Sequence, residues 1–179
     1  MLNLLPRIFV VLIAAGTVGC ADQADPVSPM ALDGGILASA ATQGSVFGSI
    51  RAATARFHRV EEATAAGYIR ISNCIVDEGI HYLKGSLVDG VLDPAQPEHL
   101  LYEVLPNGKL RLAGVEYVIV AGLWDATNAA APLLGDAQFM DRRLPPFGAP
   151  FPNYALFVWA WTHNPNGMYT QLNPQVSCP

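Results

Sequence analysis

The stretch HLLYEVLPNGKLRLAGVEYVIV, from His99 to Val120, decides the fold. It consists of two apolar runs that meet at Pro106-Asn107-Gly108-Lys109. Asn-Gly between apolar runs is a strong signal for a two-residue hairpin loop in a type I′ turn, because both central residues of that turn need positive φ. The sequence therefore predicts an antiparallel hairpin inside a sheet.

The register of this hairpin follows from its turn. If Asn107 and Gly108 are the two loop residues, the cross-strand pairs are Leu105 with Leu110, Glu103 with Leu112, Leu101 with Gly114, and His99 with Glu116. Successive side chains of a strand point to opposite faces, so His99, Glu103 and Glu116 are expected on one face. A one-residue bulge, which Gly114 could supply, would change this pairing.

The rest of the chain has the composition of one globular domain. Of its 179 residues, 51% are hydrophobic and 14% are charged, and the net charge is −5. This length is enough for one core. The negative charge and the absence of a basic cluster argue against nucleic acid as a partner.

Apolar residues recur at helical spacing from about residue 45 to residue 66, and Gly67 is a plausible helix stop. Residues 68–76, 79–83 and 154–162 have the patterns of strands. Residues 121–153 are irregular, with a short helix expected at 126–134. One helix followed by about five strands predicts a single α+β domain over residues 45–179, with the N-terminal helix packed on a twisted, mainly antiparallel sheet.

The N-terminus is expected to be an export signal rather than part of the fold. Residues 1–19 contain an apolar core, Ile8–Ala15, that is too short to span a membrane. The following Thr17-Val18-Gly19-Cys20 resembles a bacterial lipobox, in which the cysteine becomes the lipidated first residue. Thr17 departs from the usual leucine, and ordinary cleavage near Ala21 or Ala24 is the alternative.

Lipidation at Cys20 would anchor the protein to a membrane on the periplasmic or extracellular side. Ala21 and Asp22 follow the cysteine, and by resemblance to lipoprotein sorting they favour the outer membrane. Residues 20–44 are rich in small and polar residues, which is typical of a flexible tether.

Residues 68–178 resemble a family of uncharacterised exported bacterial proteins. The resemblance is carried by Gly79-Ile80-His81-Tyr82, Leu92-Asp93-Pro94, Leu101-Tyr102-Glu103, Gly114-Val115-Glu116-Tyr117, Asn164-Pro165-Asn166-Gly167-Met168 and Ser177-Cys178. It implies export but no known activity, cofactor or catalytic residue. The family pattern often has His-Val-Trp where this chain has Phe157-Val158-Trp159, and this departure weakens the expectation of a metal site.

Polar residues that could form a site are few. The sequence has no G-x-S-x-G, H-E-x-x-H, C-x-x-C, phosphate loop or dinucleotide fingerprint, so serine hydrolases and nucleotide enzymes are unsupported. The best candidates for ligand or metal contact are His81, His99, Glu103 and Glu116, which could bind a divalent metal or act in acid–base chemistry. The simpler interpretation is structural: Glu116 pairs with Arg111, Arg70 or a tyrosine hydroxyl, because a buried unpaired charge is costly.

Two classes of function follow. The first is a membrane-tethered binding module for a small ligand or an envelope protein. The second is an extracytoplasmic metal-assisted or acid–base enzyme that uses His81 and Glu116. A bound metal, or His81 and Glu116 within hydrogen-bond reach in a pocket, would favour the enzyme, whereas a filled core around them would favour binding. The sequence does not identify a cofactor.

The three cysteines predict one disulfide. An odd count is awkward for an exported protein, and lipidation of Cys20 leaves Cys74 and Cys178 to pair in an oxidising compartment. A free buried Cys74 or a catalytic thiol are the alternatives. The bridge would hold the end of the chain on the domain.

The lipobox leads to the first prediction. The wild-type protein should fractionate with membranes, and Cys20→Ser should block both lipidation and processing, because the modified thiol is removed. Fractionation and intact mass measure this. A soluble product that begins after Ala21 or Ala24 would show ordinary cleavage instead.

Overall fold

The structure, a computed structural model, describes residues 34–145 and 149–179, with side chains from residue 43 onward. The expected signal peptide at 1–19, Cys20 and the start of the expected tether lie outside the described residues. Among the described residues, no helix is both long and apolar enough to cross a bilayer.

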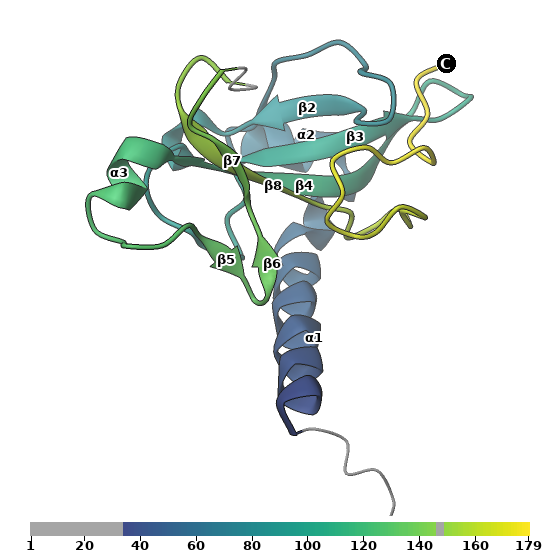
Figure 1. Cartoon of the computed structure of the whole chain (residues 1–179). Helices are drawn as coiled ribbons and strands as arrows, with labels where there is room; N and C mark the ends of the chain where they lie inside the picture. The colour runs from purple at the N-terminus through teal and green to yellow at the C-terminus, as the bar shows by residue number, and fades with distance from the viewer. Residues whose placement is uncertain (1–33, 146–148) are drawn as a thin grey trace, which may run out of the picture. The chain divides into compact units, whose positions relative to one another are not determined.

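A six-stranded antiparallel sheet forms the centre of the described fold (Figure 1). In spatial order its strands are β1 (Ile69–Arg70), β2 (Ile80–Leu83), β3 (His99–Val104), β4 (Leu110–Val120), β8 (Asn153–Val158) and β7 (Met140–Arg142). A separate two-stranded ribbon consists of β5 (Leu133–Leu134) and β6 (Ala137–Gln138). The predicted α+β class is confirmed, with six strands in the main sheet rather than five.

The expected N-terminal helix is longer and broken. It comprises α1 (Gly34–Thr54), the 3₁₀ turn η1 (Ala55–His58) and α2 (Val60–Ala65). Residues 34–44, expected to be a flexible tether, are therefore helical. Their alanines favour a helix by intrinsic propensity, a signal that does not depend on periodicity. The Thr54 hydroxyl donates to the Ile50 carbonyl, a contact that bends helices, and Arg59 is extended.

Several shorter elements differ from expectation. Of the strand expected at 68–76, β1 pairs with β2, and Ile75 forms only an isolated bridge with Gly79 across a tight turn in which Asp77 and Gly79 adopt positive φ. The helix expected at 126–134 is instead α3 (Ala121–Asp125), and a second 3₁₀ turn, η2, spans Gly85–Leu87. Strand β8 ends at Val158, because the next N–H, that of Trp159, donates to the Met168 carbonyl instead.

The β3–β4 hairpin forms with a different turn. Gly108 has a φ of 76°, its N–H donates to the Leu105 carbonyl, and Leu105 pairs with Lys109. The loop thus has three residues, Pro106 to Gly108, and the predicted type I′ turn is wrong. Proline explains this, because it cannot donate the hydrogen bond that would close a two-residue loop, whereas its fixed φ suits a type I turn.

A bulge in β4 then restores the predicted register. Leu101 lies opposite Gly114 but Tyr102 lies opposite Leu112, so Ala113 is the extra residue. The three-residue loop shifts the pairs near the turn by one position, which makes the predicted pairs Glu103–Leu112 and Leu105–Leu110 wrong. The bulge cancels that shift, and the predicted pairs Leu101–Gly114 and His99–Glu116 are confirmed.

Both faces of the sheet are covered. On one face, the helical residues Ile50, Phe57 and Ala63 pack in a core with side chains of β2, β3, β4 and β8. The opposite face has a smaller core, which consists of Leu101, Ala113, Phe157, Trp159 and Val176. The C-terminal segment, yellow in Figure 1, contributes to this second core and lies across β3 and β4.

A disulfide between Cys74 and Cys178 holds that segment in place. Their Cα atoms are 5.6 Å apart, which confirms the predicted bridge. Beside it, the Val104 N–H donates to the Ser177 carbonyl at 3.1 Å, and Val176 is buried. The bridge thus ties the loop before β2 to the end of the chain.

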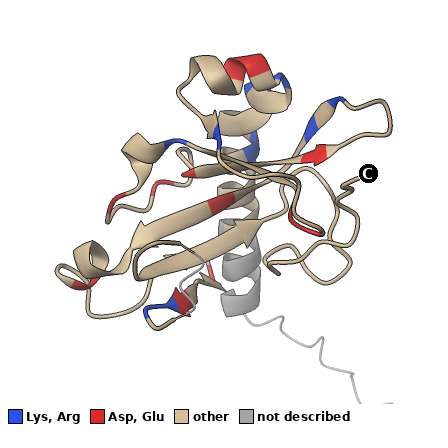
Figure 2. Ribbon diagram, turned by 90° about the horizontal axis from the view of Figure 1, so that it is seen from above, with Lys and Arg blue, Asp and Glu red and all other residues tan. Residues whose placement is uncertain are grey.

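Charged residues lie mainly in loops, turns and helices, with Lys and Arg interspersed among Asp and Glu in the part of the chain that Figure 2 colours. Three carboxylates depart from this surface distribution. Glu98, Glu103 and Glu116 are each at most 4% exposed. Each of them needs polar partners to offset its loss of hydration.

The bridge leads to the second prediction. Cys178→Ser should lower the free energy of unfolding by about 2–4 kcal/mol, because a loop of roughly 100 residues is no longer closed in the unfolded chain. Denaturant unfolding measures the loss. Dithiothreitol should destabilise the wild type to a similar extent and leave the variant unchanged. Two free thiols in denatured, unreduced wild-type protein would contradict the bridge.

Candidate functional site

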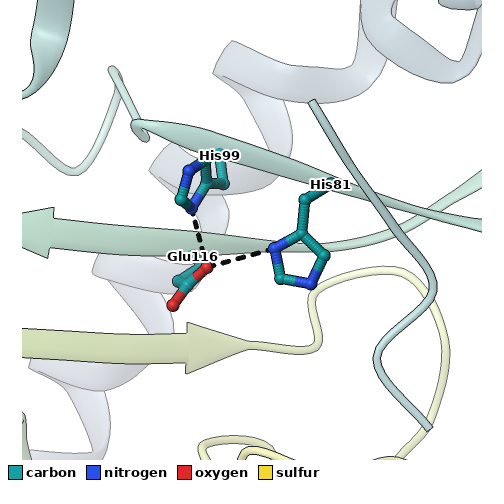
Figure 3. Close-up of side chains that lie close together, drawn as sticks. All are labelled: His81, His99 and Glu116. Carbon is teal, nitrogen blue, oxygen red and sulfur yellow. Dashed lines mark hydrogen bonds and ion pairs between the residues drawn. The ribbon is translucent and has the colours of Figure 1, made fainter. Parts of the chain in front are cut away.

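Three side chains from neighbouring strands meet on the sheet face that carries the C-terminal segment. His99 of β3 lies directly opposite Glu116 of β4, and Glu116 lies opposite Phe157 of β8. His81 of β2 is paired with Leu101, two positions along from His99, and so projects from the same face. Figure 3 shows both imidazoles turned toward the Glu116 carboxylate.

Contacts within this cluster converge on one oxygen atom. Oε2 of Glu116 lies 2.7 Å from Nδ1 of His99, a hydrogen bond, and 3.4 Å from Nδ1 of His81, an ion pair. The His81 and His99 rings meet edge to face at 5.6 Å between centroids. Donor atoms from the three residues lie within 4.8 Å of one another, so among the described residues this set could hold a metal ion.

Burial and pairing act in opposite directions on the protonation of this cluster. Burial alone would raise the pKa of Glu116, but hydrogen bonds and charge from the two histidines outweigh it and lower the pKa to about 2. Burial alone would lower the pKa of His81, but Glu116 and Glu78 together raise it to about 9. The metal-free cluster is therefore an ion pair at neutral pH, with His81 charged.

Three further side chains surround the cluster. Oε2 of Glu78 lies 3.3 Å from Nε2 of His81, and the other oxygen of Glu78 accepts a hydrogen bond from Gln171 at 2.7 Å. Arg142 donates to the Gln171 side chain at 3.0 Å, and its Nη1 lies 3.7 Å from Oε1 of Glu116. Residues of β7, of the loop before β2 and of the C-terminal segment thus fix the orientation of the cluster.

The cluster forms the polar side of a pocket of about 290 Å³. Ile71, Ile75, Val118 and Phe157 supply apolar walls, and Ser72 and Gln171 add polar groups. An apolar pocket of about 180 Å³ adjoins it and shares Ile71, His99 and Val118. The arrangement combines a charged floor with apolar walls, which is typical of small-ligand sites.

Sequence reasoning found three of these residues and misplaced a fourth. Glu103, expected with His81, His99 and Glu116, instead accepts hydrogen bonds from Arg111 and Thr162, both at 2.8 Å. The three-residue loop brings Arg111 directly opposite Glu103, so Arg111 pairs with Glu103 and not with Glu116.

The residues that sequence reasoning missed come from outside the hairpin. Arg142 lies in the stretch that was expected to be irregular, yet it ends strand β7 and its side chain lies beside Glu116. Glu78 and Gln171 carry no pattern of their own and are brought in by the turn before β2 and by the C-terminal segment. Only the three-dimensional path of the chain places them.

We compared the chain with protein-family models, with curated proteins and with solved structures, and none of them matched.

The cluster leads to the third prediction. Glu116→Ala should lower the free energy of unfolding by about 1–3 kcal/mol, because two histidines lose their buried partner. In metal-free buffer the loss should be largest between about pH 4.5 and 6.5. The depressed pKa of Glu116 contributes stability above 4.5 that disappears toward pH 2, and the raised pKa of His81 contributes stability below 6.5 that disappears toward pH 9.

Denaturant unfolding of both proteins across this pH range measures the difference. An equal difference at every pH would show that Glu116 acts through packing rather than through its charge.

Proposed function

We propose that the protein is an exported, lipid-anchored binding domain whose ligand site is the pocket above His81, His99 and Glu116. One observation carries this proposal: a carboxylate, 4% exposed and paired with two imidazoles, lines a pocket. The anchor at Cys20 and the export signal are expectations from the sequence, and with them the site would lie outside the cytoplasm.

The cost of the cluster supports a binding role. Removing charges from water is expensive, and a buried ion pair is often no more stabilising than apolar residues of similar volume. The same sheet face carries the apolar side chains of Leu101, Ala113 and Trp159. Apolar side chains in place of the cluster would therefore also fit this face. Retention of three ionisable groups beside a cavity points to a role for them in contacting a ligand.

An enzyme is the second candidate, and the geometry favours it in one respect. Nδ1 of His81 lies 3.4 Å from Oε2 of Glu116, and both residues line a pocket. This proximity is the arrangement that would favour an enzyme. The pKa values argue against unassisted acid–base catalysis, because an efficient base has a pKa near the working pH. Those of Glu116 and His81, at about 2 and about 9, lie on either side of neutrality. Glu116 and His81 are therefore poorly suited to act as a general base near neutral pH.

Native mass spectrometry tests the proposed function and is the fourth prediction. The protein is isolated from membranes in mild detergent, without chelators, as wild type and as the variants Glu116→Gln and Glu103→Gln. The wild type should carry a non-covalent mass increment that Glu116→Gln lacks. Glu103→Gln should retain it, because Glu103 is equally buried but lies with Arg111 and Thr162 instead of in the pocket.

Wild-type protein without any increment, or an increment that survives Glu116→Gln, would rule out the pocket as the ligand site. Recovery of the protein in the soluble fraction would rule out the lipid anchor. The mass increment would still show whether the pocket binds a ligand.

A further inference from the structure

We propose that the pocket binds one divalent transition-metal ion of the Zn²⁺ type, with His81, His99 and Glu116 as its protein ligands. This inference rests on the proposed function, since it names the ligand of the same pocket.

The donor set has the chemistry and the convergence of a metal site. Two imidazole nitrogens and one carboxylate oxygen suit Zn²⁺ and related ions. They come from three adjacent strands, β2, β3 and β4, and their donor atoms already lie within 4.8 Å of one another. His81 and Glu116 are at most 7% exposed, and the side chain of His99 is 12% exposed. All three donors lie on paired strands rather than on loops.

A second observation comes from the far side of the His81 ring. Among the described residues, the buried Nε2 of His81 has no hydrogen-bond partner of good geometry, although Oε2 of Glu78 is only 3.3 Å away. Metal-ligating histidines almost always direct their other ring nitrogen at a carboxylate or carbonyl, which fixes the tautomer. With Nδ1 on the metal, Nε2 carries the proton and faces Glu78. The ring is thus oriented for ligation through Nδ1.

The surrounding side chains extend this arrangement. Gln171 donates to Glu78, and Arg142 donates to Gln171. Arg142 also lies beside Oε1 of Glu116, which leaves Oε2 facing both imidazoles. Such outer contacts hold ligand side chains in the orientation that a metal needs.

A divalent ion held by the two imidazoles would also place positive charge next to the buried Glu116 carboxylate. Three protein ligands leave a coordination position open on the side of the pocket, where water or a small anion can bind.

Metal titration is the test and the fifth prediction. Purified, disulfide-bonded protein is stripped with EDTA, and Zn²⁺ is then added in a calorimeter. The wild type should bind one Zn²⁺ per chain. Glu116→Gln and His99→Asn should weaken binding at least 100-fold, because each removes a ligand. Glu78→Gln should weaken it about 10–100-fold, the usual effect of losing an outer partner.

Two controls separate metal binding from folding. Glu103→Gln removes a buried carboxylate outside the cluster and should leave Zn²⁺ affinity unchanged. Co²⁺ added to wild-type protein should give the strong visible absorption that is typical of Co²⁺ with a low coordination number. This measurement needs no variant. Zn²⁺ added in excess should abolish this absorption.

Failure to bind Zn²⁺, binding unaffected by both Glu116→Gln and His99→Asn, or absence of the Co²⁺ absorption would overturn the metal site. If the mass increment in native spectra is an organic molecule that Glu116→Gln loses, and Zn²⁺ does not bind, then the binding domain stands and the metal does not. If neither is seen, both proposals fail.

Discussion

The pairing of β3 with β4 is the constraint on which the other elements depend. It sets His99 opposite Glu116, and β2 and β8 add to its two sides so that His81 and Phe157 join the same face. The bulge that sets this register lies against the end of β8. A Cβ atom at position 114 would lie 2.7 Å from the Val158 carbonyl oxygen, so glycine permits the close approach of β8.

Burial alone does not decide how a carboxylate behaves in this fold, as two glutamates show. Glu98 is 2% exposed, and its side chain accepts one hydrogen bond, from the Val118 N–H. Burial, the larger effect, raises its pKa to about 8, so it is mainly neutral at pH 7. Glu116 is just as hidden, but its two imidazole neighbours keep it charged. The difference lies in the partners of each side chain, since Glu98 accepts a hydrogen bond from a backbone N–H and Glu116 is paired with two imidazoles.

The sequence predicted the fold class, the hairpin, the His99–Glu116 pair and the Cys74–Cys178 bridge. These follow from the alternation of side chains along strands, from turn residues and from the number of cysteines. It failed where two local rules competed. Asn-Gly favours a two-residue loop, but Pro106 beside it cannot close one. Arg142 and Gln171 could not have been found, because their contacts with the cluster depend on where a short edge strand and the C-terminal segment cross the sheet. The helix over residues 34–44 was missed because we relied on periodicity rather than on propensity.

The bulge separates the turn of the hairpin from the cluster. Ala113 is the extra residue of β4 that has no partner in β3. Its carbonyl accepts hydrogen bonds from the N–H groups of Trp161 and Thr162. The strand segment beyond it, toward Glu116, therefore has the same pairs that a two-residue loop without a bulge would give. A change of one residue in the loop can thus be offset by the gain or loss of a bulge, so this end of the hairpin is where a short insertion should disturb the pocket least.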